Sequence, residues 1–381
     1  MRKLSKGIAV LLASLLAAGM LAACGGTPSS ASAAPSSTPP AISTSAPASG
    51  SDTPSESVTF TDSAGREVEI PKNIGRIAPS GAIAQLVLYT LCPDLIVGWS
   101  SEFSGSQKEY IDEKYWSLPT FGRFYGKDVT LNKEALIATA PDIIIDVGEA
   151  KGSIREDMDM VQEQTGIPVI FIEASLESLA QAYTTLGELT GSQTQAEKLS
   201  AYITETLAMA EENRAKIADG EQVSVYYGLG ESGLEANATT NPHGAVLPIV
   251  GAVNVAEIDQ QAGGGDEISM EQLLVWNPDV ILLDPKSAYE AAQQLPEWQN
   301  LAAVQSGEIY EVPIGPYNWM GRPPSVNQIL GIRWLGNLLY PELYNYDIIE
   351  EAKTFYDLFY HYTLSDEQAE GLLANSTLKA A

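Results

Sequence analysis

The sequence repeats one structural unit at an offset of 137 residues, and this repeat constrains the fold more than any other feature. Residues 131–148 read LNKEALIATAPDIIIDVG, and residues 268–285 read ISMEQLLVWNPDVILLDP. Each copy predicts an amphipathic helix, a Pro-Asp turn and a continuous apolar strand at 143–147 or 280–283. Strands without polar alternation are typical of parallel sheets that are buried on both faces. The repeat therefore predicts two α/β lobes with a ligand cleft between them.

The first residues of the chain predict export. Residues 1–23 combine a basic start, an apolar run at 8–16 and small residues near the end, which is the pattern of a secretory signal. The sequence Leu-Ala-Ala-Cys that ends at Cys24 resembles a bacterial lipoprotein box; the alternative is ordinary signal cleavage beside an incidental cysteine. On the lipoprotein interpretation, Cys24 is lipidated and anchors the protein to the cell membrane. The folded body then faces the extracytoplasmic side, in the periplasm or at the cell surface.

Composition divides the rest of the chain into a tether and a folded body. Residues 24–57 are dominated by Ser, Ala, Thr and Pro, which predicts a disordered tether. The body is too long for one core, so we expect an N-terminal lobe at 58–175, a helical connection at 176–219, and a C-terminal lobe with C-terminal helices at 220–381. The formal net charge of −28 argues against a nucleic-acid partner, because binding to phosphates needs a basic surface.

One long helix is expected to join the lobes. Residues 176–217 contain no Pro and show helical spacing, interrupted once near Gly191. The segment 193–217 alone would reach about 37 Å at 1.5 Å per residue, which is enough to act as a rigid strut. Further predicted elements are a hairpin at 58–70; strands at 74–78, 95–99, 168–172, 223–229 and 309–312; and helices at 82–91, 245–250, 326–339 and 348–360.

These features together resemble the substrate-binding proteins of iron-siderophore, haem and cobalamin ABC importers. The resemblance rests on the lipoprotein box, the segment VTFTDSAGREVEIP, the doubled Glu-helix-Pro-Asp-strand unit, the long connecting helix and the segment WMGRPPSVN. It implies two Rossmann-like α/β lobes joined by a single long rigid helix, a fold similar to class III periplasmic binding proteins. It also implies that Glu134 and Glu271 dock onto arginines of an ABC permease dimer, which works with its ATPase. The alternative is that both are ordinary solvated helix charges.

Ligand contacts are expected from loops at the strand ends that face the cleft. Aromatic side chains gather in two of these loops, Phe121, Phe124 and Tyr125 in one and Tyr317 and Trp319 in the other, and are expected to form facing walls for a bulky chelate. The predicted ligand contacts are Tyr125, Arg123, His243, Tyr317, Trp319 and Arg322.

Two of these contacts, Arg322 and His243, also have a structural interpretation. Arg123 and Arg322 each offer a planar fork for a carboxylate or catecholate of an anionic ligand, whereas Arg322 can equally form a salt bridge that fixes the Gly-Arg-Pro-Pro turn. His243 can bind a metal or hydrogen-bond the ligand, or its ring can satisfy local backbone groups at a helix start.

Other sites are excluded or disfavoured by the sequence. Gly228, Gly230 and Gly233 match G-x-G-x-x-G, but no helix is predicted to open there, so a dinucleotide site is not expected. With two histidines in the chain, an all-protein metal cage is disfavoured, and no resident metal or cofactor is expected.

The sequence therefore predicts a lipid-anchored receptor, not an enzyme, that captures a metal chelate and passes it to a permease. A ferric siderophore leads as cargo, followed by haem, cobalamin and a nickel or cobalt chelate. The alternatives are an exported enzyme that acts on a chelate, and a surface scavenger that works without an importer.

Overall fold

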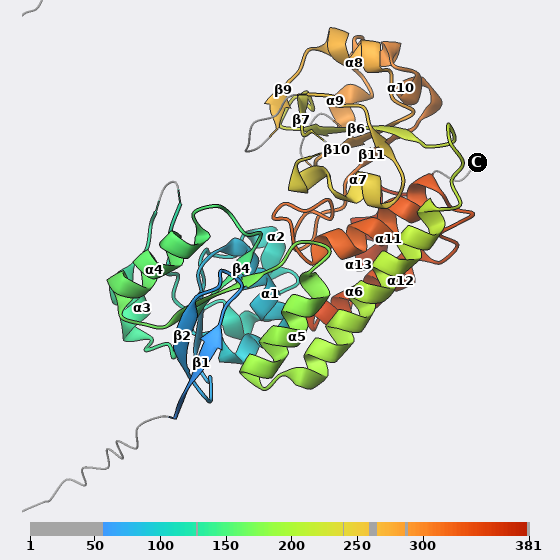
Figure 1. The fold of residues 1–381 in the computed structure, drawn as a ribbon. Coiled ribbons are helices and arrows are strands. Elements are labelled where there is room, and N and C mark those ends of the chain that lie inside the picture. The colour runs from blue at the N-terminus through green and yellow to red at the C-terminus, as the bar shows by residue number, and fades with distance from the viewer. Residues whose placement is uncertain (1–55, 127–128, 239, 259–264, 286–288, 379–381) are drawn as a thin grey trace, which may run out of the picture. The chain divides into compact units, whose positions relative to one another are not determined.

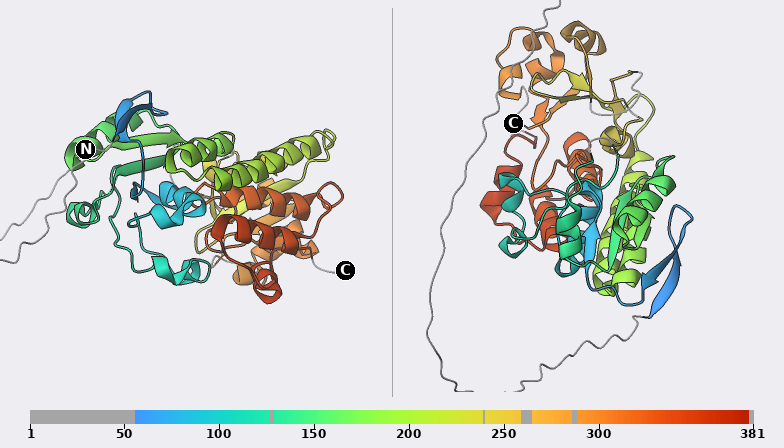
Figure 2. Two further views of the ribbon diagram at one scale, coloured as in Figure 1. Left: turned by 90° about the horizontal axis from the view of Figure 1, so that it is seen from below. Right: turned by 90° about the vertical axis from the view of Figure 1, so that its left-hand side faces the viewer.

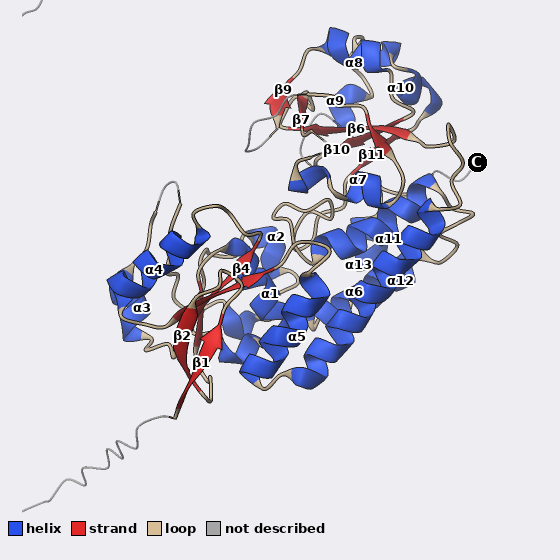
Figure 3. Cartoon of the chain, in the orientation of Figure 1, coloured by secondary structure: helices blue, strands red, loops and turns tan. Residues whose placement is uncertain are grey.

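The structure is a computed structural model that describes residues 56–126, 129–238, 240–258, 265–285 and 289–378. Cys24, the predicted signal segment 1–23 and the predicted tether as far as residue 55 lie outside the described residues. Residues Pro54–Ala381 group as one compact unit. Within this unit, two groups of strands are each surrounded by helices (Figure 3).

A hairpin opens the described chain. Strands β1 (Ser57–Thr61) and β2 (Glu67–Pro71) pair antiparallel, with Val58 opposite Ile70. The turn between them contains Gly65 at φ +71°, a left-handed conformation that glycine adopts without a Cβ clash. The hairpin predicted at 58–70 is therefore present.

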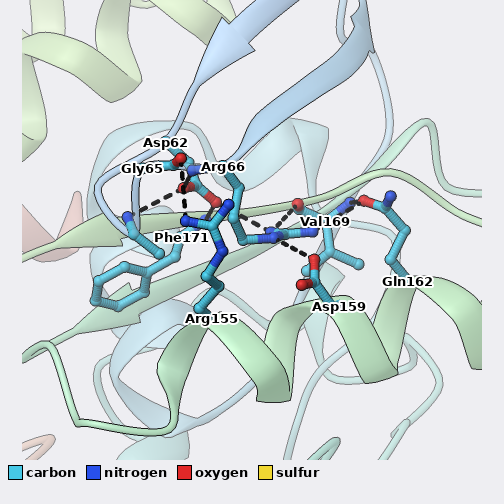
Figure 4. A network of polar contacts seen from close by, with 9 residues as sticks. Asp62, Gly65, Arg66, Arg155, Asp159, Gln162, Val169 and Phe171 are labelled. Atoms are coloured by element: carbon cyan, nitrogen blue, oxygen red, sulfur yellow. Dashed lines mark hydrogen bonds and ion pairs between the residues drawn. The ribbon is translucent and has the colours of Figure 1, made fainter.

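Arg66 fixes this hairpin to the first lobe (Figure 4). Its guanidinium donates to Asp62 at 3.0 Å, to Asp159 at 2.7 Å and to the backbone carbonyl of Val169 at 2.8 Å. Both Arg66 and Asp62 are buried, and the Asp62 carboxylate also accepts the backbone N–H of Phe171 at 3.2 Å. Because each charge has a partner, the burial of the pair is compensated.

The first lobe is built on a parallel sheet in the order β3-β4-β5. Its strands are short, buried and mostly apolar, as the sequence predicts for strands covered on both faces, and Asp146 is the one charged residue buried within β4. The elements of this lobe are β3 (Ile77–Pro79), α1 (Ala82–Leu91), η1 (Pro93–Leu95), α2 (Gly105–Lys108), η2 (Glu113–Tyr115), α3 (Lys133–Ala138), β4 (Ile143–Gly148), α4 (Ile154–Thr165) and β5 (Val169–Glu173).

The second lobe is built on a mixed sheet in the order β11-β10-β6-β7-β9, with β8 also paired to β6. The strand pairs β10–β11, β10–β6 and β6–β8 are parallel, whereas β7 pairs antiparallel with β6 and β9. Its elements are β6 (Ser224–Leu229), β7 (Glu235–Ala236), η3 (Pro242–Gly244), α7 (Val246–Ile249), β8 (Val253–Asn254), β9 (Asp266–Glu267), α8 (Met270–Trp276), β10 (Val280–Leu283), α9 (Tyr289–Ala292), η4 (Trp298–Asn300), α10 (Ala302–Ser306) and β11 (Ile309–Glu311).

Two consecutive helices lead from the first lobe to the second, α5 (Leu179–Thr190) and α6 (Gln193–Arg214). They turn at Gly191, whose left-handed φ of +71° ends α5. Helix α6 has 22 residues, or about 33 Å at 1.5 Å per residue. The predicted single long helix between the lobes is therefore present, slightly shorter than the expected 193–217.

Arg333 ties α6 to the C-terminal helices. It lies in α11 (Asn327–Leu339), and its Nε donates to the hydroxyl of Thr206 in α6 at 2.8 Å. The same guanidinium lies 4.4 Å from the ring centroid of Tyr202 and pairs with Glu351 of α12 (Ile348–Phe355) at 2.8 Å. Figures 1 and 2 show α6 beside α11 along their lengths. These contacts make the connecting helix part of a packed layer.

The last elements pack against the first lobe although they follow the second. The π-helical segment η5 (Tyr356–Tyr360) brings Tyr356 within 5.2 Å of Tyr110 and Tyr360 within 6.4 Å of Tyr89, measured between ring centroids. A final helix, α13 (Asp366–Leu372), follows. The C-terminal segment therefore links both lobes, and the lobe boundaries predicted from the sequence remain a proposal.

The strand predicted at 95–99 is wrong. Pro93 and Asp94 begin the 3₁₀ turn η1, and beyond it Ile96 and Trp99 make only isolated bridges to Ile77 and Thr120. Proline suits the first position of such a turn because it has no N–H to leave unpaired. The segment therefore runs along the sheet without joining its ladder.

Candidate functional site

A cavity of about 390 Å³ lies between segments of the two lobes. Its volume falls within the range of small-molecule sites. In the described part of the chain, the first lobe and α5 contribute Ile83, Glu149, Lys151, Ala174, Ser175, Leu176, Glu177 and Leu179. The second lobe and α11 contribute Thr240, Asn241, Pro242, His243, Ala245, Pro324, Ser325 and Gln328.

The first wall of the cavity forms where two parallel strands end. Glu149 directly follows β4, and Ala174 directly follows β5, so both segments leave the same edge of the sheet. Ligand sites in α/β sheets form at this edge because the loops of neighbouring strands meet there. The Ser175 backbone N–H donates to the Ser178 hydroxyl at 2.8 Å, which shapes the turn into α5. The strand ends thus place polar side chains around the cavity.

The second wall consists of two loops that one side chain holds together. Gln328 in α11 donates its amide to the carbonyl of Pro242 at 2.8 Å and to that of Met320 at 3.4 Å. The Asn241 side chain accepts the backbone N–H of His243 at 3.0 Å and fixes the start of η3. This wall is therefore assembled by hydrogen bonds within the second lobe and does not depend on a ligand.

The lining carries more negative than positive charge. Glu149 and Glu177 contribute two carboxylates, and Lys151 contributes one ammonium group. All three are exposed, so solvent screens their mutual interaction. The remaining polar lining consists of hydroxyl, amide and imidazole groups, which hydrogen-bond a ligand without adding charge.

His243 is the one predicted ligand contact that lines this cavity in the described part of the chain. Its Nδ1 lies 2.5 Å from the backbone carbonyl oxygen of Gly321. Because a carbonyl only accepts, Nδ1 carries the hydrogen of this bond. The ring thus satisfies a backbone group, as one interpretation of the sequence predicts, and it also lines the cavity; its contact with a ligand stays a prediction.

Arg322 forms the salt bridge that one interpretation of the sequence predicts. Its Nη1 lies 3.2 Å from Asp284 Oδ2, directly after β10. The Asp284 carboxylate also accepts hydrogen bonds from the Tyr227 hydroxyl at 2.6 Å and the Asn318 amide at 2.6 Å. The guanidinium keeps 35% of its side-chain surface exposed. Arg322 therefore fixes the turn, and it is absent from the described lining.

Tyr125 belongs to a second carboxylate site. Its hydroxyl donates to Asp146 Oδ2 at 2.8 Å, and the Ser80 hydroxyl donates to the other oxygen of the same carboxylate. Asp146 is 3% exposed, and this burial raises its pKa, while the two hydroxyl groups act in the opposite direction. Burial also raises the pKa of the Tyr125 phenol. Asp146 lies within β4, two residues before the strand ends.

The aromatic walls expected from the sequence do not form. Phe121 and Phe124 are buried and contact each other in the first lobe at a centroid distance of 6.4 Å. Trp319 is fully buried near Trp334 at 6.5 Å and donates to the Gly315 carbonyl. These rings fill the cores of their loops because burial removes their large apolar area from water. They offer no surface to the cavity.

Arg123 and Tyr317 also lie outside the described lining. Arg123 is exposed, and its backbone N–H donates to the Thr130 hydroxyl at 3.0 Å. Tyr317 is buried, its carbonyl accepts the Asn327 amide at 2.9 Å, and burial raises the pKa of its phenol, an effect that a hydrogen bond with Gln85 in α1 partly opposes. Tyr317 therefore contributes to the contact between the lobes.

Glu134 and Glu271 occupy equivalent positions on their helices. Asn132 caps α3 by accepting the Ala135 backbone N–H at 3.0 Å, and Ser269 caps α8 by accepting that of Gln272 at 3.1 Å. Each glutamate is the second residue of its helix and is exposed. Neither carboxylate has a hydrogen bond or ion pair to another described residue.

The described part of the chain holds no candidate for a metal cage or a membrane span. Within the described ranges, no group of three or more His, Cys, Asp or Glu residues is arranged to hold a metal ion. The helices described here include none that is both long and apolar enough to cross a bilayer. The Gly228–Gly233 motif ends β6 and leads into the strand β7, not into a helix.

Comparisons with known proteins show the same architecture. The family model for periplasmic binding proteins matches residues 94–314, which is more than half of the chain. A solved ABC transporter solute binding protein from Sulfurospirillum deleyianum superimposes with a TM-score of 0.76 at 27% identity, covering 83% of this chain and 99% of that one. A periplasmic solute binding protein from Veillonella parvula superimposes with a TM-score of 0.69 at 23% identity, covering 84% and 98%.

Among curated proteins, the molybdate-binding protein MolA of Haemophilus influenzae is 22% identical over 338 residues, which span 81% of this chain and 93% of MolA. The Fe(3+)-citrate-binding protein YfmC of Bacillus subtilis is 20% identical over 184 residues, which span 47% of this chain and 56% of YfmC. The family match and the two-lobed fold agree with the resemblance seen in the sequence. The chain therefore belongs to the periplasmic binding protein family: it is an extracytoplasmic substrate-binding protein of the kind that serves ABC transporters.

Proposed function

We propose that this protein is a lipid-anchored receptor that captures a metal chelate between its lobes and delivers it to an ABC permease dimer with its ATPase. The observation that carries the proposal is the cavity of about 390 Å³ with polar lining from both lobes. A ligand held there contacts both lobes at once. Contact on two sides buries most of the surface of a small ligand.

The charge of the lining favours a metal complex over a free oxyanion. Two carboxylates against one ammonium group disfavour a small dianion, although exposure weakens the effect. A neutral or cationic complex meets no such repulsion, and the hydroxyl and amide groups of the lining suit the oxygen atoms of a chelator. We propose a ferric siderophore first, then haem, cobalamin or another metal complex.

Isothermal titration calorimetry tests this cargo class. The protein without its signal segment is titrated with ferric siderophores, ferric citrate, haemin, cobalamin and sodium molybdate. We expect one metal complex to bind with a submicromolar Kd and molybdate to bind at least about tenfold more weakly, a difference of about 1.4 kcal/mol. Tighter binding of molybdate than of every metal complex would overturn the cargo assignment.

Delivery to the permease is proposed to use Glu134 and Glu271. Their equivalent places on α3 and α8 suit a partner whose two subunits present arginines to the two lobes. Carboxylates that make no other contact in the described structure keep all their oxygens for such bidentate pairing.

Charge reversal of both glutamates tests the docking. In cells that express the cognate permease, Glu134→Lys with Glu271→Lys should collapse uptake, while calorimetric affinity for the cargo stays unchanged. The matched control is Glu211→Lys with Glu212→Lys on α6, which should leave uptake intact. Normal uptake by the docking variant would favour a scavenger that works without an importer.

Anchoring at Cys24 is part of the same proposal, although the residue lies outside the described structure. Cys24→Ala should release the protein from the membrane fraction into the soluble extracytoplasmic fraction. Retention of that variant in membranes would contradict lipidation at this cysteine.

A further inference from the structure

His243 is held in the cavity wall by contacts on two sides. Its backbone N–H donates to the Asn241 side chain, and its Nδ1 donates to the Gly321 carbonyl at 2.5 Å. In a neutral imidazole with its hydrogen on Nδ1, Nε2 holds the free electron pair. Nε2 has no hydrogen-bond partner among the described residues. The ring therefore brings one fixed electron-pair donor to the cavity that it lines.

The acceptor of the Nδ1 hydrogen bond is itself held in place. Gly321 has φ +98°, and a Cβ at this position would lie 2.5 Å from atoms of Gln328. The Gln328 amide bridges the loop that carries His243 and the loop that carries Gly321. Beside Gly321, Arg322 is anchored to Asp284 after β10. Both loops are therefore held in place by contacts within the protein.

This arrangement is typical of a metal-binding histidine. Such histidines usually donate their second ring N–H to a carbonyl or carboxylate, which sets the tautomer and the orientation of the ring. The described residues contain no cluster that could hold a bare ion, which favours a metal that arrives with donor atoms of its own chelator. Glu149 and Glu177 in the same lining add negative charge that favours a metal centre.

We infer that His243 Nε2 coordinates the metal of the cargo directly, and that the cargo is a metal complex with at least one coordination position open to exchange. This inference rests on the proposed function and specifies its cargo class. On binding, a water molecule leaves the metal and the Nε2 electron pair forms the new metal–nitrogen bond. No electron is transferred, and the proton stays on Nδ1. A complex whose chelator fills every position lacks this bond and binds more weakly.

The chain offers a clean spectroscopic test because it contains two histidines. The second, His361, packs near the Tyr89 ring at a centroid distance of 6.1 Å and is not part of the described cavity lining. In the His361→Gln variant, any imidazole signal must therefore come from His243. The probes are copper(II) nitrilotriacetate, which leaves positions to water, and copper(II) ethylenediaminetetraacetate, in which the chelator occupies them.

Electron spin echo measurements and calorimetry give separate outcomes. We expect imidazole nitrogen modulation from bound copper nitrilotriacetate in the parent and in His361→Gln, and its loss in His243→Gln. We expect the parent to prefer the open complex by about tenfold or more, and His243→Gln to bind both complexes alike. Gln328→Ala, which loosens the support of the ring, should keep the modulation and weaken the open complex by about tenfold.

Two results would overturn the inference. One is an absence of imidazole modulation in His361→Gln, which needs no substitution at His243. The other is an equal loss of affinity for both complexes in His243→Gln, which would make His243 a hydrogen-bonding contact and not a metal ligand. If either result occurs while uptake still depends on Glu134 and Glu271, the proposed receptor function stands, and only the inference that His243 coordinates the metal is contradicted.

Discussion

Each lobe carries a carboxylate in or directly after a central strand, but the two carboxylates have different surroundings. Asp146 within β4 accepts hydrogen bonds from the hydroxyls of Ser80 and Tyr125. Asp284 after β10 accepts one from the Tyr227 hydroxyl, at 2.6 Å, and also pairs with the Arg322 guanidinium. One lobe thus buries its carboxylate among hydroxyl groups, whereas the other gives it a cation.

This difference has consequences for both stability and function. Burial raises the pKa of Asp146 although the two hydroxyl groups and the charge of Lys151 act in the opposite direction, so the first lobe carries a titratable group in its core. In the second lobe, the ion pair anchors the turn whose Gly321 carbonyl orients His243. The first lobe does hold a buried guanidinium, but Arg66 lies at the N-terminal hairpin, away from the strand-end carboxylate. Cations therefore brace the hairpin in one lobe and the cavity wall in the other.

Removal of the buried guanidinium of Arg66 in the first lobe should lower the free energy of unfolding more than the other substitutions. Arg66→Ala leaves Asp62 buried without its cation, so we expect the free energy of unfolding to fall by about 3–5 kcal/mol. Chemical denaturation at neutral pH measures this loss. Arg155→Ala is the matched control, because Arg155 is exposed and makes one 3.4 Å contact with the Gly65 carbonyl; its effect should stay within about 0.5 kcal/mol. Equal losses of unfolding free energy in the two variants would contradict a stabilising role of the buried Arg66–Asp62 pair.

The titration of Asp146 should have the second-largest effect on stability, and this effect should depend on pH. Its pKa is raised in the folded state, so the native protein holds this proton at pH values where the unfolded chain, with a pKa of about 3.9, has lost it. Stability from this group is complete below about pH 4 and is lost as the pH rises through the folded-state pKa. Asp146→Asn should therefore gain stability relative to the parent with rising pH, by at most about 1.4 kcal/mol per pH unit.

Denaturation curves across a pH series measure this difference. Asp219→Asn, at an exposed position, serves as control and should follow the parent at every pH. If the free energies of unfolding of the parent and of Asp146→Asn differ by the same amount at every pH, the pKa of Asp146 is not raised in the folded state.

Removal of the cation of the second lobe should cost the least stability. Arg322 and Asp284 keep 35% and 19% of their side-chain surfaces exposed, so solvent screens the pair. We expect Arg322→Ala to lower the free energy of unfolding by about 1 kcal/mol or less. A double-mutant cycle with Asp284→Asn isolates the pairwise coupling. A coupling free energy as large as the loss caused by Arg66→Ala would show that the partly exposed pair of the second lobe stabilises the protein as much as the buried pair of the first lobe.

The sequence predicted the repeated elements well because their patterns are local. Helix α1 and strand β10 have the predicted bounds, since apolar periodicity and flanking turn residues define both. The equivalence of Glu134 and Glu271 in the sequence repeat reappears as equal positions on α3 and α8. Cys92 is buried at the end of α1, and this burial raises the pKa of its thiol to about 12.

The cavity could be predicted only in part, because its lining depends on how loops fold back. Aromatic residues in a cleft loop face either the ligand or the core, and spacing does not distinguish the two; Phe121 and Trp319 face the core. Ser175 and Glu177 were not among the ligand contacts predicted from the sequence. Their signal was their place directly after the strand predicted at 168–172, where sites in α/β sheets form.

A crystal structure of the protein with the ferric complex that binds most tightly in calorimetry tests the central claim directly. Iron anomalous scattering locates the metal without reference to the chelator. The account predicts an iron peak in the cavity between the lobes, bordered by Ser175 on one side and His243 on the other. An iron peak elsewhere, for example in the hollow lined by Tyr110, Ile314 and Leu372, would contradict it.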